Sequence, residues 1–311
     1  MEQLSVFDIF KIGIGPSSSH TLGPWKAALK FREVLTSYDF DKVSIELFGS
    51  LSKTGKGHKT DIAVQLGLLG FNSETINSND INDILEGIKT SKALAFKSNV
   101  ISFSPSEDIV FINSMHEAHP NVLSFRATHK GSQVVEQTYC SLGGGFIKLI
   151  GELSKVNRNH VLTYPIENGS NVLEHTRNSG LDFWEVVYKN ETCLRTSTQV
   201  DNQLNDIYQT MKSSVYQGCI TEGILSGGLN VKRRARALCS KLLEAHQYKT
   251  IDAWETALRK TPLVFDTLHT WISCFALAVN EQNAAMGKIV TSPTNGAAGV
   301  IPAVLLYHQY F

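Results

Sequence analysis

The run from Gly15 to Pro24 concentrates polar chemistry between a Gly-Pro pair at each end. It holds three consecutive serines (Ser17, Ser18 and Ser19), followed by His20 and Thr21. Such a run of polar side chains is not typical of a hydrophobic core. The serines can cap a helix that carries Trp25 to Phe31. Backbone N–H groups at such a helix start suit a small anion such as a carboxylate or phosphate. A serine-rich cap and turn with a surface histidine explains the same run without a ligand.

Two further loops have residues suited to chemistry. In Gly55–Asp61, two glycines allow close backbone approach to a ligand and His58 lies beside two lysines, so this loop could hold a base or an anion. In Ser292–Gly299, an Asn-Gly pair permits a left-handed turn, and Thr294 and Asn295 offer side-chain donors. A turn between two helices is the alternative interpretation of the second loop.

Two common nucleotide-binding motifs are absent. Gly55–Asp61 does not match the P-loop motif, because Lys56 is followed by glycine and not by Ser or Thr. A dinucleotide fingerprint starting at Gly13 would need glycine at position 18, where the chain has Ser18. The double glycine and basic cluster of Gly227–Arg234 are, taken alone, more typical of a solvated helix start than of a binding site.

The hydrophobic pattern predicts the elements that must position these loops. Residues 42–48 alternate as a half-buried strand, residues 49–59 read as a connecting loop, and residues 61–69 form a helix that ends at Gly70. Further strands are expected at 100–103, 109–112, 122–127 and 134–140. The chain therefore divides into an α/β (α+β) domain over 1–155, a connector over 156–178 and an all-α helical bundle over 179–311.

Composition limits the classes of function. Lys plus Arg equals Asp plus Glu, at 29 each, so no basic excess would recruit nucleic acid. Neither a signal peptide nor a membrane-spanning run is recognisable, which predicts a cytoplasmic protein without a membrane partner. The five cysteines form no C-x-x-C pair, and most of them are expected to be small core residues, with no metal site assigned to them.

Taken in order, several segments resemble the iron-sulfur-dependent L-serine dehydratases, also called L-serine deaminases or ammonia-lyases, of the bacterial single-chain type. Ser5–Thr21, Gly55–Asp61 and Gly143–Phe146 are similar to signatures of that family's β domain. Glu222–Arg234 and Asn280–Pro302 are similar to landmarks of its α domain. Ser226 stands where the family usually has proline and Met286 where it usually has glycine.

The resemblance implies conversion of L-serine to pyruvate and ammonia, with a [4Fe-4S] cluster as Lewis acid and without pyridoxal phosphate (PLP). The family's cluster cysteines belong to α-domain segments after the Ser292–Gly299 loop. No cluster ligand is therefore carried over to the five cysteines of this chain. By position, Ser17, Ser18, Ser19 and Thr21 would hold the substrate carboxylate. His58 is the first choice for general base and His20 the second, and Thr294 and Asn295 would orient the substrate.

Three explanations of the expected lack of cluster ligands stay open. In the first, the chain represents part of a longer dehydratase; in the second, it is a cluster-free carboxylate-binding or regulatory protein; in the third, a second polypeptide supplies the rest. We favour the first, because the catalytic-type loops are intact and the apolar helix start at 300–307 has no terminal cap. An incomplete bundle also predicts a homo-oligomer, through the large apolar surface that it leaves.

Overall fold

A five-stranded sheet is the centre of the N-terminal half. The computed structural model describes residues 4–96, 99–152, 162–244, 248–262 and 264–311. The sheet has the order β5-β2-β6-β7-β8, and β2 is parallel to β5 while the other neighbours are antiparallel. Its strands are β2 (Lys42–Phe48), β5 (Ile109–Ile112), β6 (Val122–His129), β7 (Ser132–Gly143) and β8 (Phe146–Leu149).

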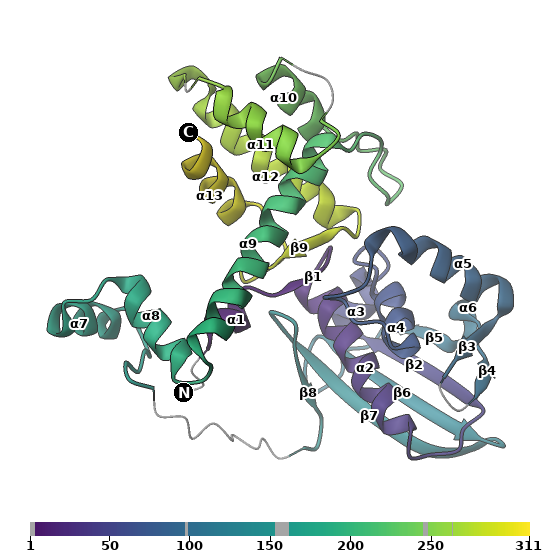
Figure 1. The fold of residues 1–311 in the computed structure, drawn as a ribbon. Coiled ribbons are helices and arrows are strands. Elements are labelled where there is room, and N and C mark those ends of the chain that lie inside the picture. Colours follow the sequence, from purple (N-terminus) through teal and green to yellow (C-terminus); the bar gives the residue numbers. More distant parts are fainter. Residues whose placement is uncertain (1–3, 97–98, 153–161, 245–247, 263) are drawn as a thin grey trace.

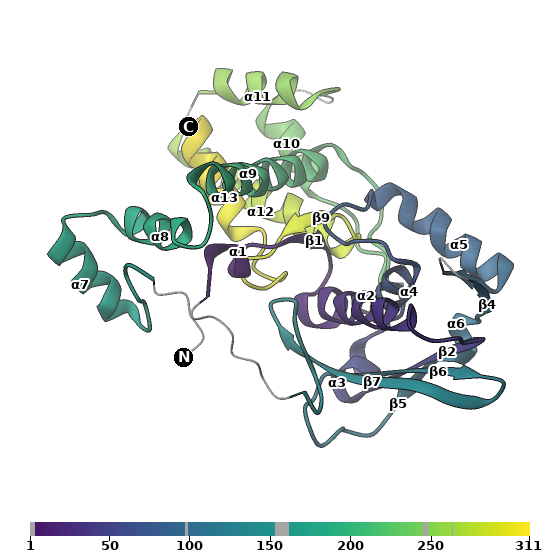
Figure 2. The ribbon, with the colours of Figure 1, turned by 60° about the horizontal axis from the view of Figure 1, so that its bottom comes forward.

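Helices cover one face of this sheet. Alternation along β2 turns Val43, Ile45 and Leu47 into the core, where Phe31 of α2 stacks on Phe125 of β6. Figure 2 shows α2 (Gly23–Leu35) and α4 (Thr60–Leu69) lying side by side over the strands. The remaining elements of this half are α1 (Val6–Ile9), β1 (Ile12–Ile14), α3 (Gly49–Thr54), α5 (Ile81–Ser91), β3 (Ala93–Ala95), β4 (Val100–Ser102) and α6 (Pro105–Asp108).

The C-terminal half is helical. It consists of α7 (Gly169–Ser179), α8 (Phe183–Thr192), α9 (Ser197–Ile220), α10 (Ala235–Leu242), α11 (Ile251–Lys260), α12 (Leu268–Ala284), β9 (Lys288–Val290) and α13 (Val300–Tyr310). The helices α9 to α13 pack around a second core, to which Trp254, Trp271 and Phe275 contribute fully buried rings. Figure 1 shows these helices gathered on one side of the molecule, with α7 and α8 projecting from the start of α9.

A two-stranded sheet joins the two halves. β1 pairs antiparallel with β9, with Ile12 opposite Val290 and Ile14 opposite Lys288. Thr291 continues the connection, because its hydroxyl donates to the carbonyl of Ile9 at 2.7 Å and accepts from the backbone N–H of Lys11 at 3.0 Å. The segment that leads into the serine-rich run is therefore anchored on the helical half (Figure 1).

The predicted order of an α/β part followed by a helical part is confirmed, and so is the strand at 42–48. The prediction of a connecting loop over 49–59 is wrong in its first half, because residues Gly49–Thr54 form α3. Residues 156–161 of the predicted connector lie outside the described residues, and α7 begins within its remainder at Gly169. None of the described helices combines the length and apolar character that a membrane crossing requires.

Candidate active site

The serine-rich run forms an unusually wide first turn. Residues Ser18–Leu22 make a π-helical turn that continues directly into α2. Ser17 caps this turn, since its hydroxyl accepts a hydrogen bond from the backbone N–H of His20 at 3.1 Å. The helix α2, which carries Trp25 to Phe31, has Leu22 at its N-cap and no side-chain cap of its own, so the serines reach it only through the π-turn. Gly23 lets β7 approach this turn, because a Cβ atom there would lie 2.0 Å from the Ser141 hydroxyl oxygen. That hydroxyl donates to the carbonyl of Ser19 at 2.7 Å.

Two buried threonines fasten this turn to the loop that carries His58. The Thr21 hydroxyl donates to the carbonyl of His58 at 2.7 Å and accepts from the N–H of Ser17 at 3.2 Å. In the opposite direction, the Thr60 hydroxyl donates to the carbonyl of His20 at 2.6 Å. Both threonines are fully buried, so these hydrogen bonds are shielded from water and fix the two loops relative to each other.

As a result, two imidazole rings lie side by side. The ring centroids of His20 and His58 are 4.8 Å apart and their planes are inclined by 42°. Burial, and after it the neighbouring His58, lowers the pKa of His20 below the usual value. Both effects disfavour the protonated form of His20.

The hydrogen bonds distinguish the two histidines. His20 uses both ring nitrogens, Nδ1 with the Ser19 hydroxyl at 2.8 Å and Nε2 with the Ser50 hydroxyl at 3.0 Å. His58 Nδ1 lies 3.0 Å from the carbonyl of Thr54, which can only accept, so Nδ1 carries the proton. The lone pair of neutral His58 is then on Nε2, which has no hydrogen-bond partner among the described residues.

Asn283, near the end of α12, connects the third predicted loop to this site. Its Nδ2 donates to the carbonyl of Pro16 at 3.0 Å, and its Oδ1 accepts from Asn295 Nδ2 at 3.0 Å. The approach requires glycine at position 15, where a Cβ atom would lie 2.2 Å from the Asn283 carbonyl oxygen. The structure thus brings all three predicted loops together, although they lie far apart in the sequence.

The predicted site residues differ in how free they are to bind a ligand. Thr294 is exposed, whereas Asn295 is 1% exposed and its Oδ1 has no partner within the described chain. The hydroxyls of Ser17, Ser19 and Thr21 all make the internal hydrogen bonds described above, and Ser18 is buried.

Asp61 is a residue to which the sequence analysis gave no role. Burial raises the pKa of its carboxyl group, and Oδ1 has no hydrogen-bond partner in the described part of the chain. A buried carboxylate oxygen without a partner destabilises the fold, and such groups concentrate at functional sites. Its position three residues after His58 was the only signal in the sequence.

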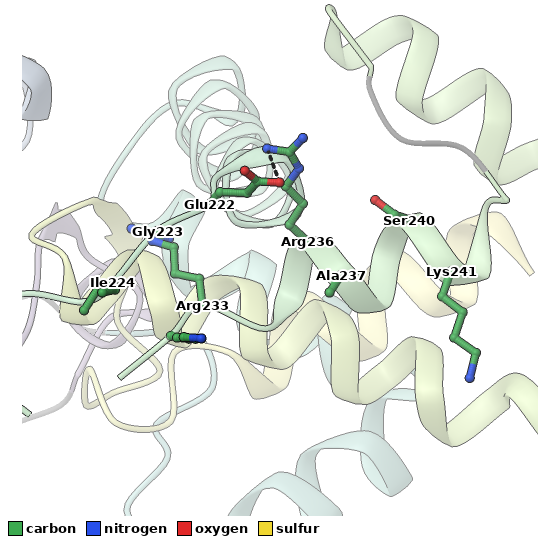
Figure 3. A pocket seen from close by; sticks show the side chains of 9 residues that line it. Glu222, Gly223, Ile224, Arg233, Arg236, Ala237, Ser240 and Lys241 are labelled. Carbon is green, nitrogen blue, oxygen red and sulfur yellow. Dashed lines mark ion pairs between the residues drawn. The ribbon is translucent and has the colours of Figure 1, made fainter. Parts of the chain in front are cut away.

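A cationic pocket of about 650 Å³ opens at the segment Glu222–Arg234 (Figure 3). In it Arg236 forms an ion pair with Glu222 at 2.8 Å, while Arg233 Nη1 is buried without a partner among the described residues. Glu281 fixes the same segment on α12 by accepting from the N–H of Arg234 at 2.6 Å. Residues 227–234 are exposed apart from the half-buried Arg233, and α10 begins directly after them, so the predicted solvated helix start is confirmed.

Three of the five cysteines converge in the helical core. Cys219, Cys239 and Cys274 are all buried, and their sulfur atoms lie within 4.8 Å of one another. The prediction that they are core residues is confirmed, but their convergence was not predicted.

Fold and site together define a two-part protein, with paired imidazoles and a serine-rich turn placed where an α/β domain is joined to a helical one. Residues 5–151 match the family model described as serine dehydratase beta chain, and residues 178–311 match that of the serine dehydratase alpha chain. The chain is 38% identical to the L-serine dehydratase of Haemophilus influenzae, in an alignment that covers 99% of this chain and 67% of that protein.

Two other relatives give the same result. Identity is 37% to L-serine dehydratase 2 of Escherichia coli and 38% to the L-serine dehydratase of Streptomyces coelicolor, each over 99% of this chain and 66% of the relative. The chain therefore belongs to the L-serine dehydratase family, and it spans about two thirds of the length of these relatives.

Proposed function

We propose that this chain binds L-serine at the three joined loops and takes part in its dehydration and deamination to pyruvate and ammonia. The observation that carries the proposal is the pair of imidazoles 4.8 Å apart, of which His58 presents an unoccupied Nε2. The names of the relatives, all L-serine dehydratases, supply the substrate.

The chemistry needs a base and assistance to the leaving group. The α-proton of serine is weakly acidic and hydroxide is a poor leaving group, so one group must remove the proton while another assists loss of the β-hydroxyl as water. The aminoacrylate that results takes up water through its imine and releases ammonia and pyruvate. We assign proton removal to His58 Nε2, because Nδ1 is already held by the Thr54 carbonyl.

His20 and the surrounding hydroxyls would have a different role. His20 is fixed between Ser19 and Ser50, and its lowered pKa favours the neutral form. Because a neutral His20 places no positive charge beside His58, it does not oppose the transfer of a proton to His58. Ser17, Ser18, Ser19 and Thr21 would border the carboxylate subsite, but three of their hydroxyls are engaged internally. The backbone N–H groups of Ser17 and Thr21 also donate within the turn, so those of Ser18 and Ser19 would be the donors to the carboxylate. Thr294 and Asn295 would orient the substrate from the helical side.

The cysteine trio does not fit the [4Fe-4S] cluster that the family resemblance implies. Cys274 and Asn283 are nine residues apart on α12, which separates the trio from the loop junction by about 14 Å at 1.5 Å per residue. An iron held there would be too far away to touch a substrate beside His58. The sulfur spacing of at most 4.8 Å also suits three ligands of one ion better than thiolates on three separate irons. These cysteines therefore take no part in the reaction.

The 311-residue chain alone is expected to hold no stable cluster, so the test is pyruvate formation from L-serine by this chain together with an α-domain segment that carries the family's cluster cysteines, prepared anaerobically with iron and sulfide. We expect pyruvate and ammonia in equal amounts, and no product from D-serine. L-serine binding measured by calorimetry without any turnover would instead favour the alternative of a carboxylate-binding or regulatory protein. A chain that neither binds nor converts L-serine would contradict the proposal.

A further inference from the structure

The cysteine trio occupies a place where three helices meet. Cys219 lies near the end of α9, Cys239 in α10 and Cys274 in α12, and these helices pack against one another (Figure 1). Their exposed fractions are 3%, 3% and 0%. Separations of 20 and 35 residues give no metal-binding motif in the sequence, so only the packing brings the thiols together.

The spacing of the sulfur atoms is close to that of ligands on one metal ion. Metal–sulfur bonds of about 2.3 Å place two thiolates about 3.8 Å apart in a tetrahedral site and about 4.0 Å apart in a trigonal one. The observed upper limit is 4.8 Å, so shifts of less than about 1 Å, within the reach of side-chain rotation, would close the site. Cys140, in the sheet, and Cys193, which is exposed, take no part in the trio.

Trp254 of α11 provides a second, independent observation. Its ring is fully buried, and its Nε1 has no hydrogen-bond partner among the described residues. Trp254 packs in the same buried cluster as the three cysteines, and its indole group contributes to lowering the pKa of the Cys239 thiol. A buried donor without a partner is costly, but the same N–H beside a metal-bound thiolate is a stabilising outer contact of the kind that tunes metal sites.

We propose that Cys219, Cys239 and Cys274 bind a single thiophilic d10 metal ion, Cu⁺ or Zn²⁺, that stabilises the helical domain and is separate from the catalytic site. Soft thiolate ligands select these ions. Binding replaces the three thiol protons by three metal–sulfur bonds and releases the protons to solvent, so no oxidant or reductant is consumed. Among the described residues, no further His, Cys, Asp or Glu joins the three sulfurs as a fourth ligand. Cu⁺, which can be three-coordinate, therefore matches the geometry better than Zn²⁺, which is usually four-coordinate.

The first test uses the 311-residue chain, unfolded, reduced and refolded without oxygen in the presence of Cu⁺ or Zn²⁺, with Cd²⁺ as a spectroscopic probe. We expect about one equivalent of ion per chain, a sulfur-to-metal charge-transfer band with Cd²⁺, and a higher thermal midpoint than in the metal-free protein. Retention of Cu⁺ or of Zn²⁺ identifies the ion. A refolded wild-type chain that retains none of the three ions overturns the proposal.

The second test locates the ligands. Cys219→Ala, Cys239→Ala and Cys274→Ala should each lose the charge-transfer band, whereas Cys140→Ala, a buried control in the sheet, and Cys193→Ala should keep it. If a trio variant does not fold, mass spectrometry of wild-type protein alkylated in urea still decides, because urea exposes the buried thiols and only bound metal should then protect these three and not Cys193. Metal binding that survives in all three trio variants, or equal alkylation of the trio with and without metal, contradicts the assignment.

Discussion

Asn283 Oδ1 accepts a hydrogen bond from Asn295 Nδ2 at 3.0 Å, between two side chains that are 8% and 1% exposed. Through its own Nδ2, Asn283 also holds the carbonyl of Pro16. One amide group thus connects the serine-rich turn of the α/β domain to the Asn-Gly loop of the helical domain.

We expect Asn283→Ala to destabilise the protein by about 1–3 kcal/mol, because the variant leaves a buried carbonyl and a buried amide without partners. Urea-induced unfolding measures the change in free energy. Asn202→Ala is the matched control, since Asn202 is exposed on α9, and it should change stability by no more than about 0.5 kcal/mol. Equal effects of the two substitutions would show that Asn283 does not couple the loops.

The two histidines should differ in their contribution to turnover. If His58 is the general base, His58→Ala lowers the rate of pyruvate formation by roughly 10² to 10⁴ in the complete enzyme, with the segment that carries the family's cluster cysteines present. His20→Ala should have a smaller effect on rate and a larger one on stability, because His20 makes two side-chain hydrogen bonds within the loops. His308→Ala, at an exposed position of α13, serves as the control. Near-normal turnover of His58→Ala together with an inactive His20→Ala would reverse the assignment.

Stability should depend on pH through His20. Its pKa is lower in the folded protein than its ordinary value of 6.5, so the unfolded chain binds more protons below about pH 6.5. The free energy of unfolding should therefore fall as pH decreases from about 6.5 through the lowered pKa. His20→Gln removes this group and should flatten the slope in that range. Chemical denaturation of both proteins at a series of pH values measures it, and parallel slopes would exclude His20 as the source.

Two glycine-to-alanine substitutions should change the stability of the protein in opposite directions. Gly15→Ala places a Cβ atom 2.2 Å from the Asn283 carbonyl oxygen, so it should displace the loop junction and lower the thermal midpoint. Gly87→Ala lies in α5 with no atom within 4 Å of the new Cβ, and it should stabilise the protein by about 0.5–1 kcal/mol. A stabilising Gly15→Ala would show that the close approach at position 15 is not needed.

Part of the fold and of the site could be predicted because the sequence patterns that specify them lie within a few neighbouring residues. The alternation at 42–48 and the Gly-terminated apolar run at 61–69 specify a strand and a helix through contacts within a few residues. The three candidate loops stand out by composition for the same reason. The helix α3 was missed because Gly49–Thr54 is a short polar stretch without a recognisable periodic face.

What the sequence by itself determined is the set of groups: serines and His20 on one loop, His58 on a second, Asn295 on a third, and five thiols. Tertiary structure alone decided which of them meet. The pairing of β1 with β9, the Asn283 contacts and the convergence of Cys219, Cys239 and Cys274 join residues that are tens to hundreds of positions apart. No local pattern encodes such contacts, because they arise when separate helices and strands bury their apolar faces against one another.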